Sequence, residues 1–221
     1  MMSNVTNNTL TSVNQIKHLT PSTYIVRIER RELEFRAGQY ILLGLPGYKN
    51  KREYSIYSGE MDPFIEVLIK EIQDGVVSKQ LKEIRPGTKL VMDGPFGFFT
   101  LSPEQIETGK FLFIASGTGI APFHSFVRSF AGLDYTILHG VRYLDEGYGK
   151  DDYDPKRYIL CTTKDPEGNF HGRVTEYIKN HPVDNQTLCY LCGNSNMIHE
   201  MHDILTEQGV PNKNLHAEVY F

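Results

Sequence analysis

The second half of the chain alternates between short apolar runs and amphipathic segments, and this alternation limits the folds that are open to it. The expected strands are 111–115, 135–140, 158–162, 188–192 and 215–220, and the expected helices are 121–130, 173–180 and 196–208. Strands that alternate with helices predict a parallel, doubly wound sheet. Such sheets bind ligands beyond the carboxyl ends of their strands. We therefore expect the functional groups of this half in loops that follow strands.

The first half has a different rhythm, in which short strands follow one another with turn residues between them. The expected strands are 23–29, 40–45, 52–57, 64–70, 90–93 and 96–101, and one helix is expected over 76–84. Several short strands with a single helix predict a small antiparallel β-barrel. The expected fold is thus an antiparallel β-barrel over residues 1–104 followed by a doubly wound parallel α/β domain over residues 105–221, with the junction at 102–109.

Composition excludes several classes of protein. The 221 residues suffice for two domains with cores of their own. A sequence pI of about 6.1 and the lack of a basic stripe argue against nucleic-acid binding. No apolar run is long enough to span a bilayer, and the N-terminus lacks the features of a secretory signal. We expect a cytoplasmic protein that acts without a membrane partner.

The three cysteines are too few for some sites and ambiguous for others. They cannot supply four thiolates to an iron–sulfur cluster or form a fully paired disulfide framework. Cys189 and Cys192 have the spacing of a metal or redox pair, but alternation along a strand would point them to opposite faces. We favour structural or cofactor-facing roles over a dithiol, and we expect no metal site.

A glycine-rich turn, Gly117-Thr118-Gly119-Ile120-Ala121-Pro122, joins an expected strand to an expected helix. Glycine permits close approach of the backbone to a phosphate, and proline suits the first turn of a helix. The motif differs from the six-residue fingerprint of dehydrogenases, and a purely structural turn is the alternative. Cys192-Gly193-Asn194 opens a second turn between a strand and a helix.

Two motifs in the first half suit a second ligand. Arg52-Glu53-Tyr54-Ser55 places a cation, a flat aromatic ring and a hydroxyl at the end of an expected strand. A guanidinium forms paired hydrogen bonds to phosphate, although a surface arginine beside ordinary strand residues is the alternative. Asp74-Gly75-Val76-Val77-Ser78 begins the expected helix, where an anion is favoured. The alternative there is that Asp74 or Gly75 only caps the helix.

In this order, and with the chain end Glu218-Val219-Tyr220-Phe221, these motifs resemble the ferredoxin–NADP⁺ reductase family of flavoenzymes over nearly the whole chain. The resemblance implies an oxidoreductase that transfers hydride between NADP(H) and FAD and exchanges single electrons with ferredoxin or flavodoxin, here expected to be a monomer. Two different enzymes would share these motifs, an NADH-dependent flavin reductase and an oxygenase reductase component. Oxygenase components often carry a [2Fe–2S] domain, for which this chain lacks cysteines and length. A flavin electron-transfer subunit without independent activity and a flavin-binding sensor would share them as well.

The resemblance also implies a flavin site. The residues expected to contact FAD are Arg52, Tyr54, Ser55, Gly75, Val76, Val77, Ser78, Thr118, Tyr220 and Phe221. Tyr54 would cover one isoalloxazine face, and Ser55 would donate to flavin N5. Tyr220 would shield the face that nicotinamide must reach, and Phe221 would pack on adenine. Because of Phe221, the chain end matches neither the plant-type nor the bacterial members of the family fully, so the roles of Tyr220 and Phe221 could be exchanged.

A nicotinamide site is implied in the same way. The residues expected to contact NADP(H) are Gly117, Thr118, Gly119, Arg142, Lys164, Arg173, Cys192, Gly193 and Met197. Catalytic roles are expected for Cys192 near nicotinamide C4, for Ser55, and for Glu218 through a hydrogen bond near Ser55.

The preference between NADPH and NADH depends on a 2′-phosphate, which needs cations. Arg142, Lys164 and Arg173 are the candidates, although Lys164 replaces the arginine that is common in bacterial relatives, and ordinary surface cations are the alternative. No acidic residue stands directly at the end of the strand before Arg142, where it would favour NADH. We expect NADPH.

Overall fold

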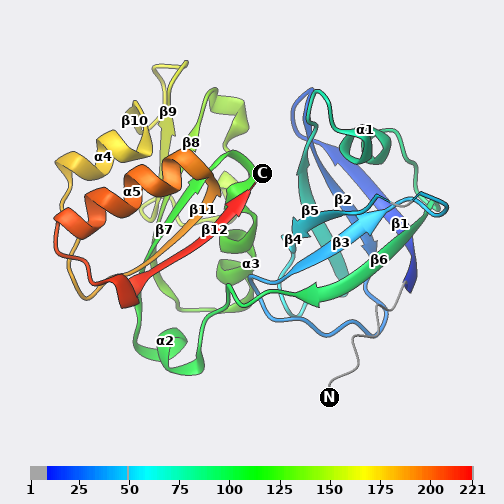
Figure 1. Ribbon diagram of the computed structural model, residues 1–221, viewed down its shortest axis with the longest axis horizontal. Helices are drawn as coiled ribbons and strands as arrows, with labels where there is room; N and C mark the ends of the chain where they lie inside the picture. The colour runs from blue at the N-terminus through cyan, green and yellow to red at the C-terminus, as the bar shows by residue number, and fades with distance from the viewer. Residues whose placement is uncertain (1–8, 49, 221) are drawn as a thin grey trace. The chain divides into compact units, whose positions relative to one another are not determined.

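The computed structural model describes residues 9–48 and 50–220 and divides into two compact units, residues 1–100 and 101–221 (Figure 1). None of the helices in these described ranges is long and apolar enough to cross a membrane.

The first unit is an antiparallel sheet that closes on itself. Its elements are β1 (Thr9–His18), β2 (Thr23–Glu29), β3 (Tyr40–Gly44), β4 (Arg52–Ser55), β5 (Phe64–Lys70), α1 (Val76–Lys82) and β6 (Lys89–Phe96). The strand order is β4-β3-β6-β1-β2-β5. The two outer strands meet where Ile56 bridges Val67 and the Tyr57 amide donates to the Glu66 carbonyl at 2.7 Å. The expected antiparallel barrel is confirmed.

The barrel is held by apolar residues that alternate along its strands. Val26 and Ile28 on β2 and Ile65 and Val67 on β5 are completely buried, as period-2 alternation requires. Helix α1 adds Leu81 to the same core. Burial of each such side chain stabilises the fold by about 1.5–3 kcal/mol.

Strand β1 was not among the expected strands, although it lies in the middle of the sheet between β6 and β2. A bulge between Val13 and Gln15 breaks its alternation, and its buried residues include the polar Thr11 and Ser12. The Thr11 hydroxyl is satisfied by the Glu29 carbonyl at 3.0 Å. The sequence pattern of a strand is therefore lost, even though β1 pairs with both of its neighbours, β2 and β6.

Strand β6 also differs from expectation, because one continuous strand replaces the two predicted at 90–93 and 96–101. Gly94 and Pro95, which separate the two predicted strands, belong to β6, and pairing with β3 continues past them to Phe96, which lies opposite Tyr40. Residues 97–101 lie outside the strand.

An ion pair between Lys51 and Asp93 gives the first prediction. The Asp93 side chain is 2% exposed, so Lys51→Met would leave a buried carboxylate without its partner. We expect the free energy of unfolding to fall by about 3 kcal/mol, measured by urea denaturation. Lys82→Met is the matched control, because the Lys82–Glu71 pair is about a quarter exposed and is worth at most about 1 kcal/mol. Equal losses in the two variants would contradict this account.

The second unit is a parallel sheet with helices on both faces. Its strands are β7 (Lys110–Ser116), β8 (Asp134–Val141), β9 (Tyr158–Thr162), β10 (Phe170–His171), β11 (Leu188–Asn194) and β12 (Leu215–Tyr220). Its α-helices are α2 (Pro103–Thr108), α3 (Ala121–Ser129), α4 (Val174–Asn180) and α5 (Ser195–Glu207). Short 3₁₀ turns are η1 (Gly117–Ile120), η2 (Leu144–Glu146), η3 (Lys150–Asp152) and η4 (Asn212–Asn214). The strand order is β10-β9-β8-β7-β11-β12, and the expected doubly wound parallel sheet is confirmed.

The two faces of this sheet have different cores. Helices α4 and α5 cover one face (Figure 1), where Ile178 and Met201 pack among aliphatic strand residues. On the other face, aromatic rings dominate: Phe113 of β7 stacks on Phe123 of α3 with ring centroids 4.9 Å apart, and it lies edge-on to Tyr190 of β11. Alternate residues of the central strands therefore serve two cores, which explains their continuous apolar runs.

Residues 102–109, expected as a junction, contain helix α2. Ser102 accepts from the Gln105 amide at 3.2 Å while the Gln105 side chain accepts from the Ser102 amide at 2.8 Å, which forms a capping box. Pro103 occupies the first helical position. These signals are present in the sequence, but the segment lacks the apolar periodicity by which helices were recognised.

The topology places a switch point in the middle of the second sheet. From β7 the chain moves outward through β8, β9 and β10, and then returns to the other side of β7 for β11 and β12. The connections after β7 and after β11 leave in opposite directions, and open α/β sheets bind ligands beyond the carboxyl ends of their strands at such a point.

Candidate active site

At this switch point the glycine turn after β7 lies directly against the end of β11. A Cβ atom on Gly119 would lie 2.3 Å from the Cys192 carbonyl oxygen. Gly193 has a φ of +132°, and a Cβ there would lie 2.3 Å from the Ser116 Oγ. Two backbone segments far apart in the sequence thus approach more closely than any side chain would permit. The structure brings the predicted Gly117–Gly119 and Cys192–Gly193 motifs together.

Two polar residues, Ser116 and Asn194, hold this junction. The Asn194 amide donates to Ser116 Oγ at 2.9 Å. The Asn194 side chain accepts from the amides of Asn196 at 3.0 Å and Met197 at 3.4 Å, and so caps helix α5. Asparagine before a helix is a common N-cap and would have identified this role. Met197, predicted at the nicotinamide site, lies partly buried in the first turn of the capped helix.

Cys192 lies fully buried beside the last strand, opposite Glu218 in the parallel register. Burial and the Glu218 carboxylate raise the pKa of its thiol well above the ordinary value, while a hydrogen bond with Tyr220 opposes this shift. The thiol therefore stays protonated at neutral pH. It is uncharged and does not act as a thiolate nucleophile.

The other two cysteines lie in the aliphatic core beneath α4 and α5. Burial raises the pKa values of Cys161 and Cys189 to about 12. Cys189 thus faces away from Cys192, as alternation along the strand predicted, and the two sulfurs do not form a dithiol site. Among the described residues, no group of three or more His, Cys, Asp or Glu side chains is placed to bind a metal.

Strand β12 places the predicted C-terminal residues beside the same edge. Glu218 pairs with Cys192 and Tyr220 pairs with Asn194, and both side chains are partly buried. Phe221 lies outside the described residues, so its predicted contact with adenine stays a prediction.

Of the three predicted phosphate-binding cations, Arg142 follows β8, Lys164 follows β9 and Arg173 immediately precedes α4. All three side chains are exposed. The Lys164 amide donates to the Arg142 carbonyl at 2.9 Å, which joins the two loops. None of the side chains of Arg142, Lys164 and Arg173 forms an ion pair with another described residue. The cations are therefore available to an anionic ligand.

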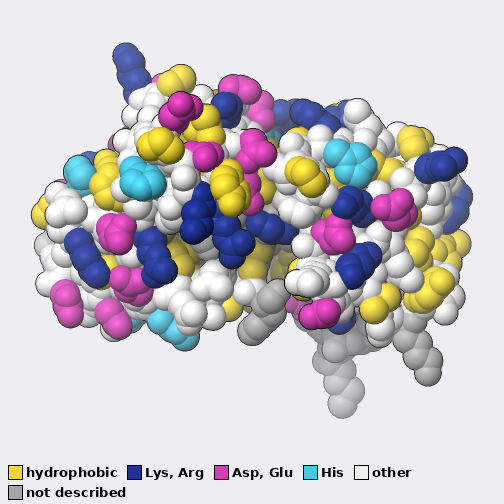
Figure 2. Space-filling view, turned by 90° about the horizontal axis from the view of Figure 1, so that it is seen from above, with side chains coloured by type: hydrophobic (Ala, Val, Ile, Leu, Met, Phe, Trp, Pro, Cys, Tyr) yellow, Lys and Arg dark blue, Asp and Glu magenta, His cyan; other side chains and the backbone are white. Residues whose placement is uncertain are grey.

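Acidic side chains lie among these cations, and the sequence analysis did not anticipate them. Glu146 accepts from the Arg142 amide at 2.9 Å, Asp165 accepts from the Leu144 amide at 2.6 Å, and Glu176 accepts from the Arg173 amide at 2.8 Å. Each carboxylate thus orders a loop through backbone amides. Figure 2 shows that basic and acidic side chains are interspersed over the face that it displays.

A buried histidine contacts the glycine turn and was missed by the sequence analysis. His139 of β8 is completely buried, with Nε2 2.8 Å from the Gly117 carbonyl oxygen and Nδ1 2.8 Å from the Tyr158 hydroxyl. Burial lowers its pKa to about 4. A lone histidine within an apolar strand gave no indication of which group it would contact.

In the first unit, strand β4 presents its predicted residues in three different environments. The Arg52 side chain is exposed, Tyr54 is partly buried, and Ser55 at the end of the strand is 4% exposed. Burial raises the pKa of Tyr54, and Arg52 opposes this shift, so the phenol is neutral at physiological pH. The strand thus offers an exposed cation, a neutral ring and an enclosed hydroxyl.

The turn before α1 is built around glycine. Gly75 is the N-cap, and a Cβ there would lie 2.8 Å from the Ser78 Oγ. That hydroxyl accepts from the Ile72 amide at 3.2 Å, so it shapes the turn. Val77 is buried with Ser78, whereas Val76 is 57% exposed at the start of the helix.

Tyr24, which was not predicted, connects these two motifs. Its hydroxyl donates to the Ser78 carbonyl, and burial together with the nearby Tyr54 raises its pKa. Strand β4 and the first turn of α1 therefore lie on the same side of the barrel. An exposed guanidinium, an aromatic ring and an uncapped helix start are a donor set that fits a flavin and its phosphates.

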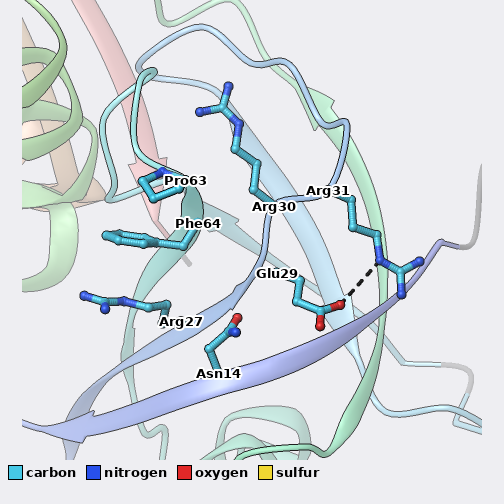
Figure 3. A pocket seen from close by; sticks show the side chains of 7 residues that line it. All are labelled: Asn14, Arg27, Glu29, Arg30, Arg31, Pro63 and Phe64. Carbon is cyan, nitrogen blue, oxygen red and sulfur yellow. Dashed lines mark ion pairs between the residues drawn. The ribbon is translucent and has the colours of Figure 1, made fainter.

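A separate pocket of about 500 Å³ opens elsewhere on the first unit (Figure 3). It is lined by Asn14, Arg27, Glu29, Arg30, Arg31, Pro63 and Phe64. Arg27 pairs with Glu66 at 2.8 Å and lies 3.8 Å above the Phe64 ring, while Arg30 donates to the Leu33 and Asp62 carbonyls. These arginines support surrounding loops, and no predicted site residue lines this pocket.

Comparison with protein families identifies both units. Residues 9–101 match the oxidoreductase FAD-binding domain, and residues 113–203 match the oxidoreductase NAD-binding domain. The chain is 28% identical over 234 residues to ferredoxin–NADP reductase B of Sorangium cellulosum, covering 93% of this chain and 94% of that protein. It is 30% identical over 197 residues to flavodoxin/ferredoxin–NADP reductase of Rhodobacter capsulatus, covering 78% and 72%.

A solved structure agrees with these matches. The ferredoxin NADP⁺ reductase of Neisseria gonorrhoeae, with bound FAD and NADP, aligns with a TM-score of 0.83 and 26% identity over 96% of this chain and 98% of that one. Oxygenase reductase components also match, but the chain spans only 66% of the length of one and 60% of another. The chain belongs to the ferredoxin–NADP reductase family of FAD- and NAD(P)-binding oxidoreductases.

Proposed function

We propose that this protein is a ferredoxin–NADP⁺ reductase, which exchanges hydride with NADP(H) through FAD and single electrons with ferredoxin or flavodoxin. The observation that carries the proposal is the contact of Gly119 with the Cys192 carbonyl at the switch point of the second sheet. In this proposal the turn at Gly119 binds phosphate, and the turn at Cys192, which lies against it, binds nicotinamide. Bound FAD supplies the two-electron and one-electron chemistry that joins the two substrates.

The residues of the first unit hold the flavin in this proposal. Arg52 binds a phosphate oxygen, and the start of α1 at Gly75 provides backbone amides for the pyrophosphate. Tyr54 lies against the ring system, and the Ser55 hydroxyl donates where hydride arrives. We thus assign FAD binding to a domain formed by residues 1–104.

Residues 105–221 bind the nicotinamide nucleotide. The Gly117–Gly119 turn approaches the pyrophosphate, while the neutral Cys192 thiol and Gly193 leave room for the nicotinamide ring. Glu218 adjoins Cys192 in the register of β11 and β12 and holds a proton-accepting group beside that thiol. Met197, in the capped first turn of α5, closes one side of the site.

The exposed cations Arg142, Lys164 and Arg173 give a prediction about nucleotide choice. We expect Arg142→Ala to lower kcat/KM for NADPH by about tenfold, because one charge-assisted bond to the 2′-phosphate is lost. The value for NADH should change by less than about twofold, since NADH lacks that phosphate. Arg128→Ala is the control at a cation elsewhere in this unit. An equal loss with both nucleotides in Arg142→Ala would contradict a 2′-phosphate site.

The proposed one-electron carrier, ferredoxin or flavodoxin, is tested by measuring electron transfer to it from the NADPH-reduced protein. We expect rapid anaerobic reduction of a flavodoxin or a [2Fe–2S] ferredoxin, and slow reduction of free FMN. The names of the Sorangium and Rhodobacter relatives support these carriers. Faster reduction of free FMN than of either protein would favour a flavin reductase.

An oxygenase reductase component is the second candidate, because such components match over most of this chain. It would reduce an oxygenase in preference to either carrier protein. Cytoplasmic location and a monomeric state both stay predictions.

A further inference from the structure

The hydrogen-bonded row Tyr158–His139–Gly117 runs from strand β9 through β8 to the glycine turn, entirely within the second unit. Both ring nitrogens of His139 are engaged at 2.8 Å, one with the Tyr158 hydroxyl and one with the Gly117 carbonyl. A carbonyl oxygen can only accept, so Nε2 must carry the proton. Nδ1 then accepts, and the Tyr158 hydroxyl donates to it.

The surroundings of His139 keep it in this single form. The ring is completely buried, and its pKa is lowered to about 4, so it is neutral at physiological pH. Tyr148 and Tyr158 lie against it with ring centroids 6.2 and 6.0 Å away. The Gly117 carbonyl fixes the tautomer in which Nε2 is the donor, and the Tyr158 hydroxyl satisfies Nδ1 by donating to it.

The direction of the Gly117 carbonyl fixes the direction of the next amide. In a trans peptide, the C=O of one residue and the N–H of the next point to opposite sides. Because the Gly117 carbonyl points toward the buried His139 ring, the Thr118 N–H points away from that ring. The φ of +55° at Gly117 is a conformation in which glycine is favoured, and it permits this orientation.

We propose that His139 is a positioning residue for nucleotide binding, which holds the Gly117–Thr118 peptide so that the Thr118 N–H donates to a phosphate of the dinucleotide. The hydrogen bond to the carbonyl also polarises the peptide and strengthens that N–H as a donor. Tyr158 supports the same peptide through the histidine. This inference rests on nucleotide binding by the glycine turn.

The first test measures binding of NADP⁺ and NAD⁺ to the FAD-loaded protein by calorimetry. We expect His139→Asn to weaken binding of both nucleotides by about tenfold, the effect of losing one well-placed donor. His139→Gln should recover part of the loss, because its terminal amide reaches the position of Nε2. Tyr158→Phe should weaken binding by about threefold, since it removes the donor that supports Nδ1 of His139 but keeps the hydrogen bond to the Gly117 carbonyl.

His124→Asn is the matched control, because His124 is also a buried histidine of this unit, but its Nε2 contacts Asp152 at 3.1 Å. It should change the dissociation constants by less than about twofold. A probe that lacks both phosphates of the pyrophosphate, adenosine 2′-phosphate, should bind His139→Asn nearly as well as wild type. Unchanged NADP⁺ binding in folded His139→Asn, or equal losses for the probe and NADP⁺, would overturn the proposal.

A second test uses the wild-type protein and does not depend on how the variants fold. In ¹⁵N NMR spectra, His139 should be neutral and protonated at Nε2 from pH 5 to 8, and the Thr118 amide resonance should shift on addition of NADP⁺. Protonation at Nδ1, or a Thr118 resonance unmoved at saturating NADP⁺, would overturn the proposal. A wild-type protein that binds neither nucleotide would instead contradict the proposed function. The NMR spectra would still show which nitrogen of His139 carries the proton.

Discussion

Replacing Gly119 with alanine is expected to slow flavin reduction by NADPH at least about a hundredfold, because displacing substrate-binding groups by about 1 Å has effects of this size. A Cβ at this position would lie 2.3 Å from the Cys192 carbonyl oxygen and 2.8 Å from the Gly193 Cα. Both are backbone atoms, so the turn and the end of β11 must separate. Anaerobic stopped-flow measurement of flavin bleaching gives the rate, and FAD content should stay unchanged.

Gly117→Ala is the matched control for this variant. Gly117 lies in the same turn with a φ of +55°, and a Cβ there would meet no atom within 4 Å. The substitution therefore introduces only backbone strain of about 1–2 kcal/mol and no collision. If Gly119→Ala kept more than half of the wild-type rate, or if Gly117→Ala were the slower variant, the close approach at the switch point would not be what organises the site.

The second large effect is expected at Ser55. Removing a hydroxyl that donates to a developing charge lowers a rate by about a hundredfold, so Ser55→Ala should slow hydride transfer by that factor. Ser55 is 4% exposed at the end of β4, and its removal should leave the FAD content and the affinity for NADP⁺ unchanged. Single-turnover stopped-flow measurement separates the hydride step from nucleotide binding.

Ser58→Ala provides the comparison for Ser55→Ala. Ser58 is also buried, three residues further along, but its hydroxyl accepts from the Glu66 amide at 3.0 Å. This substitution should reduce stability by about 1 kcal/mol and leave the hydride step unaffected. A similar fall in rate in both variants would show that Ser55 acts through the barrel and not at the flavin.

Regular patterning allowed most of the fold to be predicted. Strands β2, β5, β9 and β12 have the predicted bounds, since each joins alternating or continuous apolar residues to clear turn signals. Strand β1 was missed because a bulge and buried threonine and serine residues disrupt its period. Helix α2 was missed because its signals are polar caps and no residue of it is buried.

The candidate site could be predicted only where its residues form local motifs. The glycine turn and Cys192-Gly193 are each visible in the sequence, but the 2.3 Å approach between them depends on the order of the strands. The His139 side chain contacts a carbonyl of the glycine turn, and the Tyr24 hydroxyl donates to a carbonyl of helix α1. No local pattern specifies a partner that lies 22 or 54 residues away.

The measurement that tests the central claim most directly is an anaerobic stopped-flow titration of the purified, FAD-loaded protein with NADPH and NADH in parallel. Our account predicts rapid flavin bleaching by NADPH at concentrations far below those needed with NADH. Bleaching by neither nucleotide at saturation would contradict the proposed hydride transfer. A preference for NADH would contradict the phosphate site formed by Arg142, Lys164 and Arg173.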